Sequence, residues 1–282
     1  MIDAQLQRFK SNLLWQIRSW FNHKGYLEVM TPVRVISPAL EHNLIAISSE
    51  KNWLRTSPEF ALKKAISSGL HRVYEIGSCF RSEESGPHHS SEFTMLEFYQ
   101  VGSGLWAFMD EVILLLNACA EWAQLQLPNW EFIPSHELLD PNLSPEDWFF
   151  QWVDQIEPNL PNACVVHSYP KWQAALSKVN QKHAERFEVY WNGIELGNAF
   201  HEELSGENLI SRWLQSNELR KNCNLPPHPI DHSFIEANTK MPRCSGIAIG
   251  LERLLICLSN ENHIQAFQIP SGIQEFTYDA TR

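Results

Sequence analysis

Two extended segments joined by a short polar turn constrain the fold of this chain more than any other feature. Residues 73–81 and 93–101 have the length and the apolar and aromatic content of strands, and Ser, Gly and His are frequent in the turn between them. Arg81 ends the first segment, and Glu83 and Glu84 follow it. The pattern predicts two strands that carry an arginine, carboxylates and aromatic rings on either side of a polar turn.

The remaining elements favour an α+β fold. Apolar residues recur at helical spacing over residues 4–23. Residues 187–191 and 194–200 flank Asn192-Gly193, a pair that suits the tight type I′ turn of a hairpin. Long stretches without regular strand–helix alternation separate the strands, which argues against a doubly wound parallel sheet.

A single domain is predicted for residues 1–282, with one irregular insert. Residues 126–165 are rich in Pro and Trp and show weak periodicity, which is typical of loops and short helices. The sequence shows no internal repeat, coiled coil or low-complexity segment that would divide the chain.

Charge and cysteine usage exclude some classes of function. The chain has 22 Lys and Arg against 33 Asp and Glu, a formal net charge of −11, so we expect no broad basic face for nucleic acid. The six cysteines form no Cys-x-x-Cys pair, which favours a reduced, cytoplasmic protein. The N-terminus lacks the apolar core of a signal peptide, and no run of about 18 apolar residues could span a bilayer.

Two arginines are candidates for binding the phosphates of a nucleotide. Arg81 ends a strand, and Arg253 follows the small-residue strand Gly246-x-Ala248-x-Gly250, where a ligand can approach the backbone closely. Each also has a simpler interpretation. Arg81 could pair with a neighbouring carboxylate, and Arg253 could be a solvated residue in the first turn of a helix. The sequence contains neither a P-loop nor a nucleophile elbow.

Glu195 and Glu202 are candidate ligands for Mg²⁺, which prefers carboxylates together with substrate phosphates. Their odd separation of seven residues would point them to opposite faces of a regular strand. We predict a bulge between them, at Gly197 to Ala199, that brings both to one face. The alternative is that Glu195 faces outward on the strand and Glu202 lies at the approach to a helix.

Two further positions have both a functional and a structural interpretation. Phe93 could stack on adenine, or it could join the core, which is the commoner place for a strand phenylalanine. In Ser57-Pro58-Glu59 the glutamate could bind an ammonium group. The same residues could equally start a helix, with Ser57 as its cap and a favourable carboxylate in the first turn.

Taken in order, these segments resemble the active site of class II aminoacyl-tRNA synthetases. Residues 56–99 and 184–255 are similar to the catalytic core of lysyl-tRNA synthetases, and more closely to the elongation factor P–(R)-β-lysine ligases. Residues 25–32 resemble the dimerisation motif of the class. The resemblance implies an antiparallel sheet of about six or seven strands, flanked by helices and assembled as a homodimer.

The resemblance also implies which residues form the site. The positions that match an ATP site are Arg81, Glu83, Glu92, Phe93, Glu195, Leu196, Gly250 and Arg253. Among them Arg81 and Arg253 would be the catalytic residues. The positions that match a site for a lysine-type amino acid are Ser57, Glu59, Tyr99 and Glu202. Ala248 stands where the ligases carry alanine and the synthetases typically glycine, which favours (R)-β-lysine over α-lysine.

The implied activity uses ATP and Mg²⁺ to form an aminoacyl-adenylate and transfers the aminoacyl group to a lysine side chain of elongation factor P. A tRNA substrate is not expected, because no anticodon-binding barrel precedes the helix that begins at residue 4. Two alternatives stay open. One is a free-standing synthetase core that charges a tRNA or small carrier, and the other is a catalytically silent regulatory paralogue that binds an amino acid.

The chain departs from the ligase pattern at two places. Ser90-Ser91 replaces an Asn-Pro pair before the second strand segment, and Gly197 and Ala199 exchange two small residues along the pocket strand. Both changes lie in segments assigned to the site, so they bear on the amino acid that it prefers.

Overall fold

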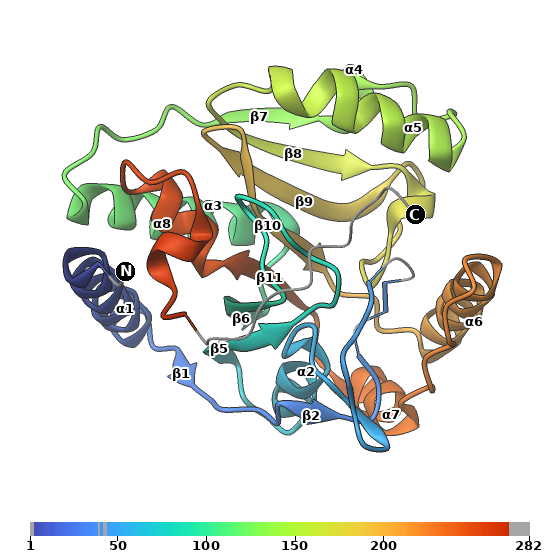
Figure 1. The fold of residues 1–282 in the computed structure, drawn as a ribbon. Coiled ribbons are helices and arrows are strands. Elements are labelled where there is room, and N and C mark those ends of the chain that lie inside the picture. The colour runs from blue at the N-terminus through green and yellow to red at the C-terminus, as the bar shows by residue number, and fades with distance from the viewer. Residues whose placement is uncertain (1–2, 39, 42–43, 271–282) are drawn as a thin grey trace, which may run out of the picture.

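In this computed structural model the described residues, 3–38, 40–41 and 44–270, are built around a mixed eight-stranded sheet (Figure 1). Neighbours in the series β5, β6, β11, β10, β9 and β8 pair antiparallel. At the two edges, β1 pairs parallel with β5 and β7 pairs parallel with β8. The prediction of a six- or seven-stranded antiparallel sheet is therefore wrong at both edges. The spatial order is β1 (Leu27–Glu28), β5 (Arg72–Phe80), β6 (Glu92–Val101), β11 (Cys244–Gly250), β10 (Ile194–His201), β9 (Ala184–Trp191), β8 (Ala163–Tyr169) and β7 (Glu131–Pro134).

Helices cover the sheet and connect its strands. The α-helices are α1 (Ala4–His23), α2 (Glu59–Ser67), α3 (Leu105–Trp122), α4 (Ser135–Leu138), α5 (Pro145–Gln151), α6 (Gly206–Asn222), α7 (His232–Lys240) and α8 (Leu251–Cys257). Short π- and 3₁₀-helical turns lie at Trp152–Ile156, Glu157–Asn159, Lys171–Gln173 and Ile264–Phe267. A small second sheet contains β2 (Arg34–Val35), β4 (Asn52–Leu54) and β3 (Ser48–Ser49). Among the described residues, no helix has the length and apolar character needed to cross a membrane.

The segment predicted as an irregular insert, 126–165, supplies most of one edge of the sheet. Parallel strands cannot be joined by a tight hairpin, so β7 reaches β8 through a crossover that contains α4 and α5. In this crossover Trp148 and Trp152 stack with ring centroids 4.6 Å apart, and both pack against Tyr169 of the sheet. The Pro- and Trp-rich composition therefore belongs to a packed crossover.

One face of the sheet is closed by α1, α3 and α8, which carry most of the apolar core. Helix α1 has the bounds that the sequence predicts and begins after Asp3, whose carboxylate accepts hydrogen bonds from two backbone N–H groups. Phe21 of α1 stacks on Tyr74 of β5 at 4.2 Å. Leu96 and Phe98 of β6 point into the same core and are fully buried. Glu97 between them, and Tyr99 after them, therefore point to the opposite face.

On that opposite face α2, α6 and α7 pack on one another beside the sheet. Phe60 of α2 stacks on Phe234 of α7 at 4.1 Å, and Trp213 of α6 joins them. Leu62 and Ile66 of α2 lie in a cluster with residues of β5 and β6. Helix α2 is thereby fixed against the strands with its polar side chains near the face of the sheet.

A buried ion pair ties α2's entry loop to the sheet. Arg55 Nη1 lies 2.7 Å from Glu75 Oε1 and 2.7 Å from Thr31 Oγ1, and its Nε donates to the carbonyl of Ser78 at 2.9 Å. A Cβ at Gly77 would lie 2.3 Å from the guanidinium, so only glycine leaves it room. The pair holds three segments together immediately before the strand end that carries Arg81.

We predict that Arg55→Leu lowers the free energy of unfolding by about 3–5 kcal/mol, because it leaves the Glu75 carboxylate buried without its cation. Urea unfolding followed by circular dichroism measures the change. Arg34→Leu is the matched control, because the Arg34–Glu50 pair is largely exposed and should contribute less than about 1 kcal/mol. Equal losses in the two variants would contradict the structural role of the buried pair.

Candidate active site

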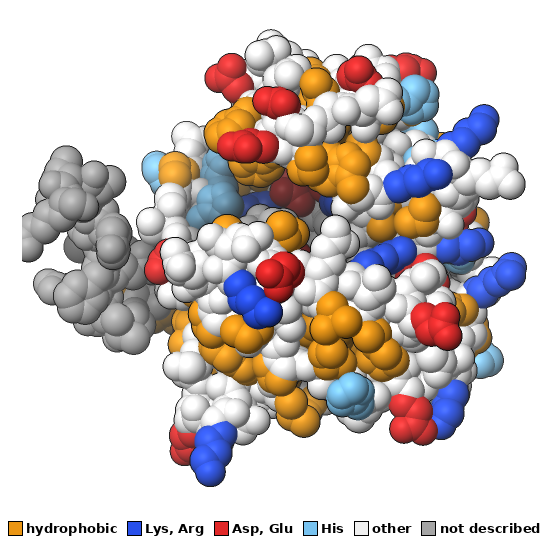
Figure 2. Space-filling model, turned by 90° about the vertical axis from the view of Figure 1, so that its right-hand side faces the viewer, with side chains coloured by type: hydrophobic (Ala, Val, Ile, Leu, Met, Phe, Trp, Pro, Cys, Tyr) orange, Lys and Arg blue, Asp and Glu red, His pale blue; other side chains and the backbone are white. Residues whose placement is uncertain are grey.

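A row of side chains crosses five strands on the face opposite the main core. Strand pairing places Glu75 beside Glu97, Glu97 beside Ala248, Ala248 beside Asn198, and Asn198 beside Glu188. Directly paired residues point to the same face of a sheet. Figure 2 shows a hollow between the upper and lower parts of the molecule, with acidic and basic side chains inside it.

A bulge in β10 brings Glu195 and Glu202 to this face. Pairing with β9 shifts register between Glu195 and Gly197, which makes Leu196 the extra residue. Leu196 and Ala199 are three positions apart, so they would point to opposite faces of a regular strand, but both side chains enter the core. The predicted bulge is present, but it starts one residue before the predicted segment. A Cβ at Gly197 would lie 2.4 Å from the Ala248 carbonyl oxygen, so glycine permits this close approach.

Five side chains from α2, β6 and the end of β10 form what we call the carboxylate cluster: Glu59, Lys63, Glu97, Tyr99 and Glu202. The Lys63 ammonium lies 2.6 Å from a Glu59 oxygen and 2.5 Å from a Glu202 oxygen. The Tyr99 hydroxyl donates to Glu97 at 2.7 Å. Burial raises the pKa of Glu202 to about 8 although Lys63 opposes the shift, and burial also raises the pKa of Glu97.

Several buried polar atoms beside the cluster have no hydrogen-bond partner within the described part of the chain. They include Ser57 Oγ, Asn198 Oδ1 and one oxygen of Glu97. Ser57 does not cap α2 as the sequence suggested, because α2 has no side-chain cap. Buried polar groups are ordinarily paired, so these atoms mark where a polar ligand would bind. Ala248 is half-buried and lies between Glu97 and Asn198 in the row.

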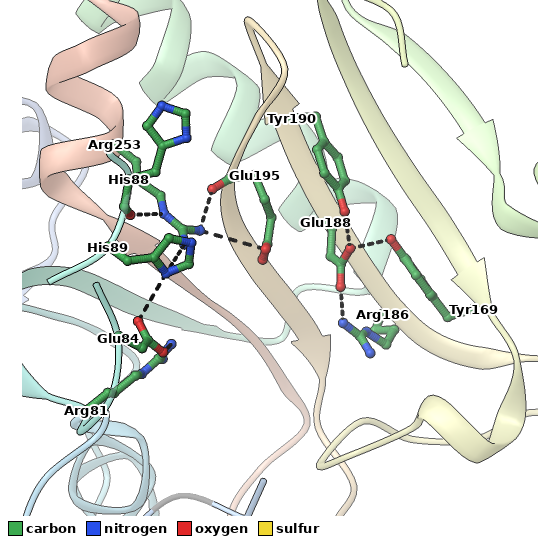
Figure 3. Close-up of polar contacts among 10 residues, drawn as sticks. All are labelled: Arg81, Glu84, His88, His89, Tyr169, Arg186, Glu188, Tyr190, Glu195 and Arg253. Carbon is green, nitrogen blue, oxygen red and sulfur yellow. Dashed lines mark hydrogen bonds and ion pairs between the residues drawn. The ribbon is translucent and has the colours of Figure 1, made fainter. Parts of the chain in front are cut away.

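The two predicted arginines are linked through Glu84 and His89 of the turn between β5 and β6 (Figure 3). The Arg81 guanidinium lies 5.1 Å from the centre of the Phe93 ring and 3.5 Å from Glu84. Arg253 Nη1 donates to the Glu195 carbonyl at 2.9 Å, and its Nε donates to the His88 carbonyl at 3.2 Å. Both cations therefore flank the space beside Phe93 and Glu195.

The other residues predicted for the ATP site differ in their exposure and in whether their side chains can face a ligand. Glu83 has a φ of 63° in the turn, and the side chain of Glu92 is exposed at the start of β6. Gly250 is the N-cap of α8, three residues before Arg253. The Leu196 side chain is only 1 % exposed and lies in the core, so Leu196 can face a ligand only through its backbone.

Glu188 of β9 is a site residue that the sequence reasoning missed. It accepts hydrogen bonds from Tyr169 at 2.5 Å and from Tyr190 at 2.7 Å, and it pairs with Arg186. The alternation of polar side chains at 188 and 190 within the strand predicted at 187–191, continued by Arg186 just before it, is the signal that could reveal it. Burial and the neighbouring Glu188 carboxylate raise the pKa of Glu195 to about 7.

These contacts bear on the metal ligands that the sequence predicted. Glu202 is on the expected face, and the Lys63 ammonium lies 2.5 Å from one of its carboxylate oxygens. Glu188 lies close enough to raise the pKa of Glu195, and Arg186 pairs with Glu188 while Arg253 lies 3.8 Å from Glu195. Two neighbouring carboxylates are a donor set that Mg²⁺ accepts alongside phosphate oxygens. No group of three or more His, Cys, Asp or Glu side chains that could hold a metal ion occurs among the described residues.

The fold and the order of these groups agree with comparisons against known proteins. The family model of class II tRNA synthetases (D, K and N) matches residues 4–269. The chain belongs to this family. It is 31% identical to the elongation factor P–(R)-β-lysine ligase of Haemophilus ducreyi, over 91% of this chain and 90% of the relative. Relatives of the same name from Buchnera aphidicola of Schizaphis graminum (31%, over 90% and 92%) and Yersinia enterocolitica (30%, over 93% and 94%) are similarly close.

We predict that Gly246→Ala lowers the free energy of unfolding by about 1–3 kcal/mol and displaces Tyr99, because the new Cβ would lie 2.2 Å from its ring. Urea unfolding measures the first effect and a crystal structure of the variant the second. Gly104→Ala is the control: a Cβ added there would meet no heavy atom within 4 Å, and its cost should stay below about 1 kcal/mol. A Gly246→Ala protein as stable as that control, with Tyr99 unmoved, would show that the close packing is not required.

Proposed function

We propose that this chain activates a lysine-type amino acid, (R)-β-lysine, with ATP and transfers it to a lysine side chain of elongation factor P. The observation that carries the proposal is one sheet face with arginines at one end and buried carboxylates at the other. Arginines suit phosphates, and carboxylates suit an ammonium group. A substrate that bears both a carboxylate to activate and an amine to be recognised matches this arrangement.

The arginines act on the nucleotide. Arg81 lies where it can neutralise charge that develops on the α-phosphate, and Phe93 beneath it offers a face for adenine. Arg253 is fixed by the Glu195 and His88 carbonyls and binds the remaining phosphates. Glu188 and Glu195 would hold Mg²⁺, which when bound neutralises phosphate charge and orients the phosphates.

The carboxylate cluster acts on the amino acid. Glu59 and Glu202 accept hydrogen bonds from its side-chain ammonium group, at the positions where they contact Lys63, and Tyr99 and Ser57 orient it. An oxygen of the substrate carboxylate attacks the α-phosphorus of ATP, and the bond to the departing pyrophosphate breaks. The amine of the acceptor lysine then attacks the adenylate carbonyl, and AMP leaves. Catalysis is mainly positioning and electrostatic stabilisation, without a protein nucleophile.

The proposed acceptor is elongation factor P, and the proposed assembly is a homodimer. The relatives are named for elongation factor P as acceptor, and the net charge of −11 argues against tRNA. Because this acceptor is a translation factor, the reaction belongs in the cytoplasm. Trp15, Leu27 and Met30 expose 69, 51 and 95% of their surface around α1 and β1, and a two-fold homodimer would cover them.

A transfer assay tests the function directly. Labelled (R)-β-lysine, ATP and the chain are incubated with elongation factor P, with a variant of that factor lacking its acceptor lysine, or with total tRNA. We expect label only on the intact factor. Label on tRNA would favour a free-standing synthetase core, and no label on any acceptor despite adenylate formation would remove elongation factor P from the proposal.

We predict that Arg81→Ala and Arg253→Ala each reduce ATP–pyrophosphate exchange on the order of 10²-fold or more, because each removes a preorganised phosphate contact. The unfolding midpoint should change little in either. Arg18→Ala is the control, since Arg18 pairs with Glu28 at the surface and should leave exchange unaltered. Near-normal exchange in an arginine variant would remove that residue from the phosphate site.

We predict different defects for the two candidate metal carboxylates. Glu188→Gln should raise the Mg²⁺ concentration for half-maximal exchange about tenfold, because one of two carboxylate ligands loses its charge. Glu202→Gln should leave that concentration unchanged and raise the KM for the amino acid. The reverse pattern would return Glu202 to the metal site. Glu185→Gln, on the same strand as Glu188, is the control and should change neither parameter.

We predict that Ala248 contributes to the choice between lysine isomers. Ala248 lies between Glu97 and Asn198 in the row of side chains, where the amine nearer the substrate carboxylate would bind. The two isomers differ by one carbon in the position of that amine. A misfit of one carbon is worth roughly 10–200-fold. Exchange should therefore favour (R)-β-lysine over α-lysine by that order, and Ala248→Gly should relax the ratio. An unchanged ratio in this variant would place the source of specificity elsewhere, for example at Gly197 and Ala199.

A further inference from the structure

Lys63 is a buried cation in the middle of the amino-acid site that the proposed reaction does not use. It lies one helical turn after Glu59 on α2, and its side chain is 1 % exposed. Its ammonium lies 2.6 Å from Glu59, 2.5 Å from Glu202 and 5.8 Å from the centre of the Tyr99 ring. The carboxylates that it joins come from α2 and from the residue after β10, so it links two elements across the pocket.

Three carboxyl groups lie around Lys63, which carries the one ammonium group of the carboxylate cluster. Facing Glu202 are Glu59 and Lys63 from α2, Glu97 and Tyr99 from β6, and Cys244 from β11. Tyr99 and Cys244 are neutral, because burial raises both of their pKa values. Burial also raises the pKa values of Glu97 and Glu202, so a further cation from a ligand would favour the ionised forms of these carboxyl groups.

We propose that Lys63 is a positioning residue that bridges Glu59 and Glu202 and fixes their carboxyl groups in the pocket, so that their free oxygens accept hydrogen bonds from one further ammonium group of the substrate. The inference rests on the proposed function and assigns to Lys63 the choice of amino acids with a second amine. Lys63 does not touch the reacting atoms.

The electrostatics of the pair support this role. Burial alone would lower the pKa of Lys63, but Glu202 and Glu59 raise it above its ordinary value, so the ammonium stays charged. The pKa of Glu202 is about 8 even with Lys63 beside it. Without Lys63 the pKa of Glu202 would rise further, so a substrate ammonium would meet a carboxyl group that loses its proton less readily.

The same geometry explains how a neutral side chain would be rejected. A carboxylate oxygen that is buried and already desolvated loses its intended partner when the substrate lacks the amine. Sites built to hydrogen-bond a polar group reject analogues without it far more strongly than apolar pockets reject a missing methylene. Norleucine, which has the lysine carbon skeleton without the terminal amine, is therefore the informative competitor.

The test compares Lys63→Met, which keeps the side-chain length, with Lys63→Arg, which keeps the charge. ATP–pyrophosphate exchange is measured with (R)-β-lysine, α-lysine and norleucine, and KM values are taken for ATP and for the amino acid. In Lys63→Met we expect the KM for the preferred lysine isomer to rise on the order of 10²-fold and its preference over norleucine to fall at least about tenfold. The KM for ATP should change less than about threefold, and Lys63→Arg should recover most of the loss.

Lys64→Met is the matched control, because Lys64 is the next residue on α2 and pairs with Asp231 outside the site. It should leave both KM values and the preference unchanged. The inference is overturned if Lys63→Met keeps the lysine preference and KM, if both KM values rise together, or if Lys63→Arg is as impaired as Lys63→Met. A wild-type chain that exchanges with neither lysine isomer overturns the proposed function, and the role of Lys63 falls with it. If Lys63→Met does not fold, Lys63→Arg is compared with the wild-type chain. A folded Lys63→Arg protein that keeps the lysine preference and KM supports the inference, and one that loses both overturns it.

Discussion

A single extra residue in one strand determines which side chains of β10 face the site. Because Leu196 bulges out of register with β9, Glu195 lies on the same face as Asn198 and Glu202. In a regular strand, either Glu195 or the pair Asn198 and Glu202 would point into the apolar core formed with α1, α3 and α8. An unpaired carboxylate there would be very unfavourable. The bulge therefore allows one strand to serve both ends of the substrate, with Glu195 near the phosphates and Glu202 near the ammonium.

Charge burial is the second constraint, and it explains why the site needs its ligands. The cluster of Glu59, Glu97 and Glu202 has one internal cation, and Glu188 and Glu195 face each other with Arg186 and Arg253 at the sides. Buried like charges raise one another's pKa values and are relieved by a cation. A substrate ammonium at one end and Mg²⁺ with ATP at the other would supply these charges. The protein thus gives up stability in the empty site to gain selectivity when both substrates are bound.

The sequence predicts the local parts of this architecture well. Helix α1 has the predicted bounds, and Asn192 and Gly193 both have positive φ in the hairpin turn, as a type I′ turn requires. The need for a bulge followed from the odd spacing of Glu195 and Glu202. Arg81 and Arg253 are linked through Glu84 and His89, and their role at phosphates stays a prediction. Each of these inferences depends on neighbouring residues or on strand alternation, which a sequence displays directly.

The parts that the sequence did not predict depend on contacts between distant segments. The two-residue strand β1 and the four-residue strand β7 exist only because they pair in parallel with β5 and β8. Glu188 resembled any polar strand residue until its register beside Asn198 and its two tyrosine donors were known. Lys63 resembled an ordinary helix lysine, since nothing local shows that Glu202 lies against it.

The measurement that tests the central claim most directly is amino-acid-dependent ATP–pyrophosphate exchange by the wild-type chain. The panel contains (R)-β-lysine, α-lysine, ornithine, norleucine and several neutral and acidic amino acids. The account predicts Mg²⁺-dependent exchange with the lysine isomers and almost none with norleucine, because norleucine keeps its α-ammonium group but lacks the side-chain ammonium group that the carboxylate cluster binds. Exchange with norleucine as fast as with lysine, or no exchange with any amino acid, would contradict it.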